Sequence, residues 1–251
     1  MSTPIEHQIP TDSGPVPGLL WFPDGRADGA RVPGLVVFQE IFGVTEFVRS
    51  RCADLAELGY AVLAPAVYAR LVEPGQEAPV IEAHEDDFLE RSMGLVGELD
   101  WELAVRDGLA ARDALAGVDG VDADRVGLVG FCFGGGLAFN VAAAAAQAGR
   151  PVAALVSYYG SALPNLLGLA EHVDCPSLHH FGTSDSYIPM EQVERIREAV
   201  TASGAREQVR FELHEGADHA FDNPHPMFHH AAASARAWEQ TEAFLAEVLP
   251  T

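Results

Sequence analysis

The chain has few cysteines, few basic side chains and no long apolar run. Its 251 residues include 3 widely spaced cysteines and no C-x-x-C pair, which suits a reducing compartment and makes the cytoplasm the expected location. No apolar run approaches the roughly 20 residues that a membrane span needs. Residues 1–10 have neither a basic segment nor an apolar core, so we expect no secretory signal.

Acidic side chains greatly outnumber basic ones. The sequence holds 15 Lys and Arg against 37 Asp and Glu, which gives a net charge of -22. This excess disfavours nucleic acids and anionic membranes as partners, because both carry negative charge themselves. The hydrophobic fraction of 48% is ample for a large core.

Short apolar runs alternate with helical patterns along the chain. Strands are expected at 5–9, 18–22, 33–38, 60–64, 126–129, 152–158, 177–181 and 208–213, the first two as an edge hairpin. Helices are expected at 45–58, 98–115, 137–146, 189–202 and 231–248, the first with Thr45 as its cap and Gly59 as its stop.

This alternation predicts an α/β fold with a mostly parallel central sheet and helices on both faces. We expect a single domain over residues 1–251, because the sequence has neither internal repeats nor a linker. The less regular segment 70–97 could form a partial lid, and 119–124 is expected to be a turn-rich connector.

A strand that turns abruptly into an apolar helix surrounds Cys132. The run 126–129 is wholly apolar apart from Gly127, and Gly130 and Gly134 stand two residues on either side of the cysteine. This pattern is typical of a nucleophile elbow, whose usual form is G-x-S-x-G. The helix that follows would direct its positive end at the sulfur and favour a thiolate. The alternative is a buried structural cysteine at a tight turn.

Two later loops offer the partners that a thiol nucleophile needs. Asp185 follows the strand 177–181, and His219 follows the last strand. A base must take the proton of the nucleophile, and a carboxylate must orient that base. The order nucleophile, acid, base is that of the α/β-hydrolase fold. Asp185 could instead be a turn or cap residue and His219 a solvated loop residue, while Asp174 and Asp218 are weaker candidates for the acid.

Longer runs of residues make the pattern more specific. They are Gln39-Glu40-Ile41-Phe42-Gly43, the segment 60–70 with its Tyr68-Ala69-Arg70 end, and the elbow Gly130-Phe131-Cys132-Phe133-Gly134-Gly135. Together with the loops of Asp185 and His219, they resemble the dienelactone hydrolase family, whose members are cysteine-nucleophile enzymes of the α/β-hydrolase fold. The resemblance implies hydrolysis of a small-molecule ester or lactone by a monomer or small homo-oligomer, without a metal or an organic cofactor.

The resemblance also implies roles for individual residues. Cys132 matches the nucleophile, His219 the base and Asp185 the carboxylate that orients it. Glu40 matches an acidic residue that contacts the resting thiol and takes part in its activation, although by itself it could be a loop carboxylate in solvent. The backbone N–H groups of Ile41 and Phe133 match an oxyanion hole, whose donors are typically worth about 3 kcal/mol each.

The substrate-binding positions depart from the family. Relatives that act on dienelactone hold its carboxylate with two arginines, one of which lies four residues past the histidine. Here that position is Asn223, which brings neither charge nor a bidentate fork. The second arginine falls in the irregular segment, where Arg91 is the nearest candidate. With Tyr68, which we interpret mainly as structural support near the pocket, these are the candidate substrate contacts, and they predict a substrate less dependent on a carboxylate anchor.

The implied chemistry is acyl transfer through a thioester on Cys132, which His219 then hydrolyses by activating water. Three alternatives remain open. The same fold could serve a thioesterase, another acyl transferase or a C–C hydrolase, or it could be a non-catalytic binding scaffold. A metal site could also form in the last loop, although its spacing matches no standard zinc pattern; its candidate ligands are Asp218, His219, Asp222, His225, His229 and His230.

Overall fold

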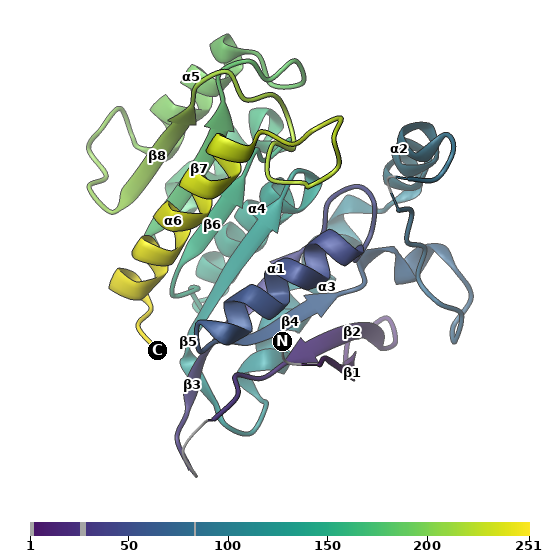
Figure 1. Cartoon of the computed structure of the whole chain (residues 1–251). Helices are drawn as coiled ribbons and strands as arrows, with labels where there is room; N and C mark the ends of the chain where they lie inside the picture. The colour runs from purple at the N-terminus through teal and green to yellow at the C-terminus, as the bar shows by residue number, and fades with distance from the viewer. Residues whose placement is uncertain (1–2, 26–28, 83) are drawn as a thin grey trace. The chain divides into compact units, whose positions relative to one another are not determined.

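The computed structural model describes residues 3–25, 29–82 and 84–251 (Figure 1). Its internal contacts divide the chain into two compact units, Met1–Gly127 with Thr251, and Leu128–Pro250, which we call the first and the second unit. Strands and helices follow one another in both, as the sequence predicts. The single domain expected for residues 1–251 stays a prediction.

The first unit contains four strands in the order β1-β2-β4-β3. They are β1 (Ile5–Ile9), β2 (Val16–Trp21), β4 (Ala61–Pro65) and β3 (Val32–Phe38). The expected hairpin of β1 and β2 is confirmed as an antiparallel pair, and β3 pairs with β4 in parallel, Gly34 opposite Ala61. All of β4 and nearly all of β3 are buried, as their unbroken apolar runs predict for strands covered on both faces.

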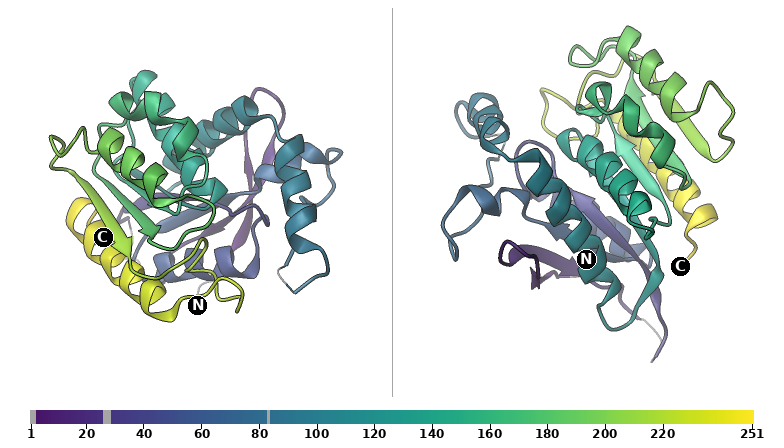
Figure 2. Two further views of the ribbon diagram at one scale, coloured as in Figure 1. Left: turned by 90° about the horizontal axis from the view of Figure 1, so that it is seen from above. Right: turned by 180° about the vertical axis from the view of Figure 1, so that it is seen from behind.

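Helices cover both faces of this sheet. Helix α1 (Glu46–Glu57) lies on one face of β3 and β4, and α3 (Trp101–Ala116) lies on the other (Figures 1 and 2). Gly59 ends the segment after α1 with a φ of 105°, a value that favours glycine, so the expected stop is confirmed.

The expected position of the α1 cap is confirmed, but the side chain of that residue does not form the capping hydrogen bond. Thr45 occupies the N-cap position, but its side chain makes no capping hydrogen bond, and its hydroxyl is buried without a partner among the described residues. The carboxylate of Glu82, from the segment after β4, instead accepts the backbone N–H of Glu46 at 3.1 Å. A residue distant in sequence thus takes over part of the capping, which local patterns cannot predict.

The segment 70–97 is more regular than its prolines and charges suggest. A short 3-10 helix (Val67–Leu71) precedes it, and an α-helix of 11 residues, α2 (Phe88–Glu98), fills its end. The helix buries Phe88 and Ser92 and leaves most of its surface exposed. Leu99 has an extended backbone, and Asp100 caps α3 by accepting the N–H of Leu103 at 2.9 Å. The expected helix over 98–115 therefore begins at Trp101, and residue 98 belongs to the end of α2. A role of 70–97 as a lid stays a prediction.

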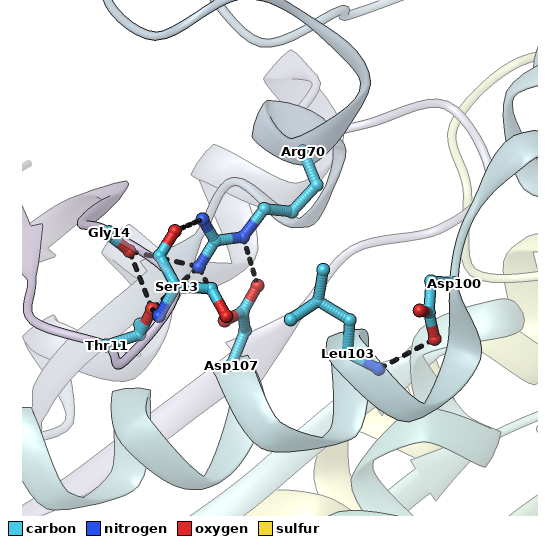
Figure 3. A network of polar contacts seen from close by, with 7 residues as sticks. All are labelled: Thr11, Ser13, Gly14, Arg70, Asp100, Leu103 and Asp107. Carbon is cyan, nitrogen blue, oxygen red and sulfur yellow. Dashed lines mark hydrogen bonds and ion pairs between the residues drawn. The ribbon is translucent and has the colours of Figure 1, made fainter.

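Arg70 ties three parts of the first unit together (Figure 3). Its guanidinium forms a two-point contact with Asp107 of α3, with Nε and Nη2 each 2.8 Å from one carboxylate oxygen. The remaining N–H groups donate to the turn between β1 and β2, at the carbonyls of Ser13 and Gly14 and the hydroxyl of Thr11. Because Asp107 is nearly buried, this fork compensates a carboxylate that has lost water.

We therefore expect Arg70→Lys to lower the free energy of unfolding by about 2 kcal/mol, because an ammonium group cannot form the fork and reach the turn together. Urea denaturation measures this change. The control is Arg91→Lys, whose half-exposed ion pair with Glu85 should contribute nothing measurable. Equal effects of the two substitutions would contradict the structural role of Arg70.

The second unit carries a parallel sheet in the order β5-β6-β7-β8. Its strands are β5 (Val121–Phe131), β6 (Leu155–Tyr158), β7 (Ser177–Gly182) and β8 (Val209–His214). One line of register runs through Leu128, Leu155, Ser177 and Val209. Strand β5 begins in the first unit, within the stretch 119–124 expected to be a connector, and the buried side chain of Val121 anchors this extension.

Helices again cover both faces. Helix α6 (Ala231–Val248) lies on one face of this sheet, and α4 (Phe133–Gln147) and α5 (Met190–Val200) lie on the other (Figures 1 and 2). Helix α4 is buried along almost its whole length, as its alanine-rich sequence predicts. The loop after β6 contains two 3-10 helices, Leu163–Asn165 and Leu167–His172. In the described ranges, no helix combines the length and the apolar character that crossing a bilayer requires.

Three buried histidines lie in the core of this unit. His180 on β7 bonds to His214 on β8 at 3.1 Å and to Thr241 of α6 at 3.1 Å. His179 lies on the other side of β7 between the rings of Phe139 and Phe211. Burial lowers the pKa of His179 and of His214 to about 4. Burial also lowers the pKa of His180 well below its ordinary value, helped by the neighbouring imidazoles.

The unfolded chain binds protons at these histidines below a pKa of about 6.5, whereas the folded protein resists them until about pH 4. The free energy of unfolding should therefore fall as the pH drops from 6.5 to 4. We expect His179→Phe to remove about 3 kcal/mol of this loss, and urea denaturation at several pH values measures it. His172→Phe, at a side chain 39% exposed, is the control and should keep the wild-type slope.

Candidate active site

The turn from β5 into α4 presents the thiol of Cys132. Its φ is 54° and its ψ is -117°, a conformation that L-residues rarely adopt. A Cβ atom at Gly130 would lie 2.0 Å from the carbonyl oxygen of Gly134, so only glycine permits this turn. The backbone N–H of Cys132 donates to the carbonyl of Tyr158 at 3.0 Å and holds the strained residue in place.

An imidazole lies against the sulfur. His219 Nε2 is 3.1 Å from Cys132 Sγ, and Nδ1 is 2.8 Å from Asp185 Oδ2. The three residues follow β8, β5 and β7, whose carboxyl ends meet at one edge of the parallel sheet. The structure thus brings together the three side chains expected as nucleophile, base and orienting acid.

Asp185 has two separate roles. While Oδ2 faces the imidazole, Oδ1 accepts the backbone N–H groups of Tyr187 and Ile188, each at 2.8 Å. The side chain is fully buried. The sequence left open whether Asp185 is a turn residue or the partner of His219, and in the structure it is both. The turn fixes the position of the carboxylate that contacts the imidazole.

Asp218, the weaker candidate for the acid, connects the two loops. Its Oδ1 accepts the backbone N–H of His219 at 2.7 Å and that of Ser186 at 2.8 Å, as well as the Ser186 hydroxyl at 3.2 Å. Although partial burial acts to raise it, these hydrogen bonds hold the pKa of Asp218 below its usual value. Asp218 therefore keeps the His219 loop beside the Asp185 loop.

Two tyrosine rings flank the imidazole. The rings of Tyr159 and Tyr187 each lie 5.3 Å from that of His219 between centroids. Tyr159 is buried and strained, with a φ of 36°, whereas Tyr187 is 59% exposed. Sequence reasoning missed both. The position of Tyr187, two residues after the acid, is the signal that could have identified it.

The surroundings of His219 favour its charged form. Burial alone would lower its pKa, but the negative charge of Cys132 and the hydrogen bond to Asp185 outweigh burial and raise the pKa to about 10. A proton therefore resides on the imidazole at neutral pH, beside the sulfur that is expected to be the nucleophile.

Glu40, Ile41 and Tyr68 belong to the first unit. Glu40 is fully buried, which is contrary to the alternative of a solvated loop carboxylate. The hydroxyl of Tyr68 donates to the carbonyl of Ile41 at 2.8 Å, so Tyr68 supports the loop that carries Ile41. Phe133 is the first residue of α4, in the second unit. The activation role of Glu40 and the oxyanion hole of Ile41 and Phe133 stay predictions.

Arg91 and Asn223, the other two candidate substrate contacts, both interact with other parts of the protein. Arg91 lies on α2 and forms an ion pair with Glu85 at 2.8 Å. Asn223 is buried, and its Oδ1 accepts the backbone N–H of His225 at 3.0 Å, so its side chain shapes the loop after His219. A substrate role of either residue stays a prediction.

The last loop also contains the proposed metal ligands. His230 caps α6 by accepting the N–H of Ala233, and Asp222 accepts a hydrogen bond from Ser234 at 2.7 Å. Over residues 3–25, 29–82 and 84–251, no three His, Cys, Asp or Glu residues are grouped as a metal site requires.

Fold and site together define a hydrolase of the α/β-hydrolase class. The chain belongs to the dienelactone hydrolase family, whose sequence model matches residues 17–249. It is 34% identical over 231 residues to the carboxymethylenebutenolidases of Pseudomonas putida and Pseudomonas knackmussii, which covers 89% of this chain and 92% of each relative.

Solved structures show the same similarity. A protein of Klebsiella pneumoniae has a TM-score of 0.80 and 28% identity and covers 98% of this chain and 99% of its own. A dienelactone hydrolase-like promiscuous phosphotriesterase from metagenomic libraries has a TM-score of 0.78 and 26% identity, with 98% of both chains covered.

The raised pKa of His219 generates a prediction for the thiol. Alkylation of Cys132 by iodoacetamide should proceed at a nearly constant rate between about pH 6.5 and 9, because the proton already resides on the imidazole. In His219→Ala the rate should rise steeply with pH, as for an ordinary thiol. Mass spectrometry of the labelled peptide measures both rates.

Cys52 and Cys175 are internal controls. Both are buried, and burial raises the pKa of each thiol well above its ordinary value, so neither should react. A wild-type rate at Cys132 that climbs steeply over the same range would show that His219 does not hold the proton.

Proposed function

We propose that this chain hydrolyses carboxylic ester or lactone bonds of small molecules through Cys132, His219 and Asp185. The observation that carries this proposal is the 3.1 Å contact between Cys132 Sγ and His219 Nε2, in a ring whose Nδ1 meets a buried carboxylate. A thiolate held beside an imidazolium is the arrangement that thiol-dependent acyl transfer requires. Membership of the dienelactone hydrolase family supports the same reaction class.

In the first half of the reaction, the thiolate attacks the carbonyl carbon and forms a C–S bond while the carbonyl electron pair moves to oxygen. The N–H groups of Ile41 and Phe133 would donate to that oxyanion. Collapse of the intermediate breaks the C–O bond, and Nε2 of His219 gives its proton to the departing alkoxide. The product is an acyl-thioester on Cys132; with a lactone, the alcohol remains part of the acyl chain.

In the second half, the neutral His219 takes a proton from water, which attacks the thioester carbonyl. The second tetrahedral intermediate expels the Cys132 thiolate, so the acid leaves and the ion pair is restored. Asp185 keeps Nδ1 protonated and the ring oriented through both halves. As the family resemblance implies, Glu40 would take part in activation of the thiol when substrate arrives. No step needs a metal or an organic cofactor.

The substrate we propose depends little on a carboxylate anchor. Asn223 stands where relatives carry an arginine, and its side-chain oxygen already accepts a backbone N–H. Arg91, the other candidate, is half exposed and paired with Glu85. Neither residue offers the free guanidinium fork that holds a carboxylate in two places. A small neutral ester or lactone therefore fits these residues better than an anionic one.

Three further expectations from the sequence remain predictions. They are a cytoplasmic location, no nucleic-acid or membrane partner, and a monomer or small homo-oligomer. Thioesters are the main alternative substrates, because a thioester and an ester meet the same nucleophile. Phosphotriesters are a second class worth assaying, since a structurally similar protein bears that activity in its name.

The test is Cys132→Ala, which should abolish hydrolysis of simple aryl esters, with kcat/KM reduced at least about a thousandfold because no nucleophile remains. The matched control is Cys175→Ala, which removes another buried thiol and should keep activity. In His219→Ala, mass spectrometry should detect acyl-Cys132, because deacylation lacks its base. Near-normal turnover by Cys132→Ala would overturn the proposal.

The same assay decides the substrate class. We would compare kcat/KM for matched esters, lactones, thioesters and phosphotriesters, each with and without a carboxylate group. A strong requirement for the carboxylate would contradict the neutral-substrate proposal while leaving the role of Cys132 intact.

A further inference from the structure

The loop that follows β6 lies unusually close to the nucleophile elbow. A Cβ atom at Gly135 would lie 2.7 Å from the hydroxyl oxygen of Ser157 and 2.9 Å from the Cα of Gly160, and one at Gly136 would lie 2.5 Å from the Cβ of Ala162. Such distances exclude any side chain at the two glycines. The glycines after Cys132 therefore have a second role besides forming the elbow, because they allow the segment 157–162 to pack closely against α4.

Backbone hydrogen bonds fix this segment against Cys132 itself. The N–H of Cys132 donates to the carbonyl of Tyr158 at 3.0 Å, and the N–H of Ser161 donates back to the carbonyl of Cys132 at 3.1 Å. The position of residue 161 is thus tied to the main chain of the nucleophile. Its backbone would stay in place after its side chain is changed.

The hydroxyl oxygen of Ser161 lies within hydrogen-bond reach of the Cys132 thiol, which donates to it in the structure. Ser161 Oγ is 3.9 Å from Cys132 Sγ, within the range of hydrogen bonds to the large sulfur atom. In the part of the chain that the structure describes, this sulfur is the side-chain partner of that hydroxyl. His219 Nε2 at 3.1 Å and Ser161 Oγ are therefore both polar neighbours of Cys132 Sγ.

We propose that Ser161 is a further residue of the reaction, which donates a hydrogen bond to the Cys132 thiolate and stabilises it as the leaving group when the acyl-thioester is hydrolysed. This inference rests on the proposed function. In the acyl-thioester the sulfur carries no proton, so the Ser161 hydroxyl is the donor of this contact and the sulfur accepts as negative charge develops on it. Hydrogen bonds to a charged atom are stronger than neutral ones, so the contact strengthens in the step that expels the thiolate.

The experiment compares Ser161→Ala with Ser161→Thr, which retains a hydroxyl, and with Ser157→Ala. Ser157 is the matched control, because it lies in the same segment and its hydroxyl is buried without a partner among the described residues. Two quantities are measured for each variant: the pH profile of Cys132 alkylation by iodoacetamide, and kcat and KM for an aryl ester whose deacylation limits turnover.

In Ser161→Ala, the acid limb of the alkylation profile should move to higher pH by about half a unit, because the thiolate loses a donor. The value of kcat should fall about threefold to tenfold, with KM within about twofold, since the effect lies in the step that breaks the C–S bond. Ser161→Thr and Ser157→Ala should both resemble the wild type. Ser161→Gly replaces Ser161→Ala if that variant is unstable by circular dichroism.

A Ser161→Ala variant that matches the wild type in both quantities would overturn the inference, as would a Ser161→Thr variant that behaves like Ser161→Ala. Alkylation needs no turnover, so its result is independent of the proposed function. If Cys132→Ala is inactive while Ser161→Ala is unchanged, only the role of Ser161 fails. If Cys132→Ala remains active, the proposed function fails, and the role of Ser161 in it fails as well.

Discussion

The site depends on one unfavourable backbone conformation that its surroundings hold in place. Cys132 has a positive φ, and Gly130 and Gly134 approach each other so closely that no Cβ fits between them. Such a turn costs on the order of 1–3 kcal/mol, which the buried strand β5 before it and the buried helix α4 after it must offset. In return, the thiol stands clear of the sheet at the edge where the loops of Asp185 and His219 begin.

The other parts of the site follow from this placement. The imidazole needs both a fixed position and a proton, and different groups provide them. Asp218 accepts a hydrogen bond from the backbone of His219, and the rings of Tyr159 and Tyr187 pack against the imidazole. Asp185 forms a hydrogen bond with Nδ1 of the ring. The charge of the sulfur then opposes the effect of burial and keeps the proton on the ring. Asp185 thus contributes to both the position and the charge of the ring, whereas Asp218 and the two tyrosines contribute to its position.

Local patterns were sufficient for the elbow and for the order of the elements. The spacing of Gly130, Cys132 and Gly134 can be recognised because a strained turn restricts its neighbours sterically. The positions of Asp185 and His219 follow from the rule that loops at the carboxyl ends of parallel strands converge. The alternation of buried strands and helices likewise follows from hydrophobic periodicity.

Contacts between distant segments were beyond that reasoning. Hydrophobic periodicity does not reveal helix α2, because prolines, glycines and charges around it obscure the pattern. The contact of Glu82 with the start of α1 cannot be predicted locally either, because Glu82 lies 37 positions beyond Thr45. Ser161 belongs to no motif, and the only sequence signal of Tyr187 is its position two residues after Asp185, so the roles of both depend on their neighbours in space. Asn223 could be noticed as a departure from the family, but its hydrogen bond to the backbone of His225 depends on how the loop folds.

The divided carboxylate of Asp185 has a consequence for any attempt to redesign this site. One oxygen closes the turn of residues 185–188 that precedes α5, and the other faces the ring. An asparagine at this position has the same shape but a single oxygen. If that oxygen faced the ring, its NH2 group would face the N–H groups of the turn. If the oxygen faced the turn, the NH2 group would face Nδ1 of His219, which must itself donate a hydrogen bond. The turn before α5 and the imidazole therefore share the two equivalent oxygens of one carboxyl group, and no isosteric amide side chain can serve both.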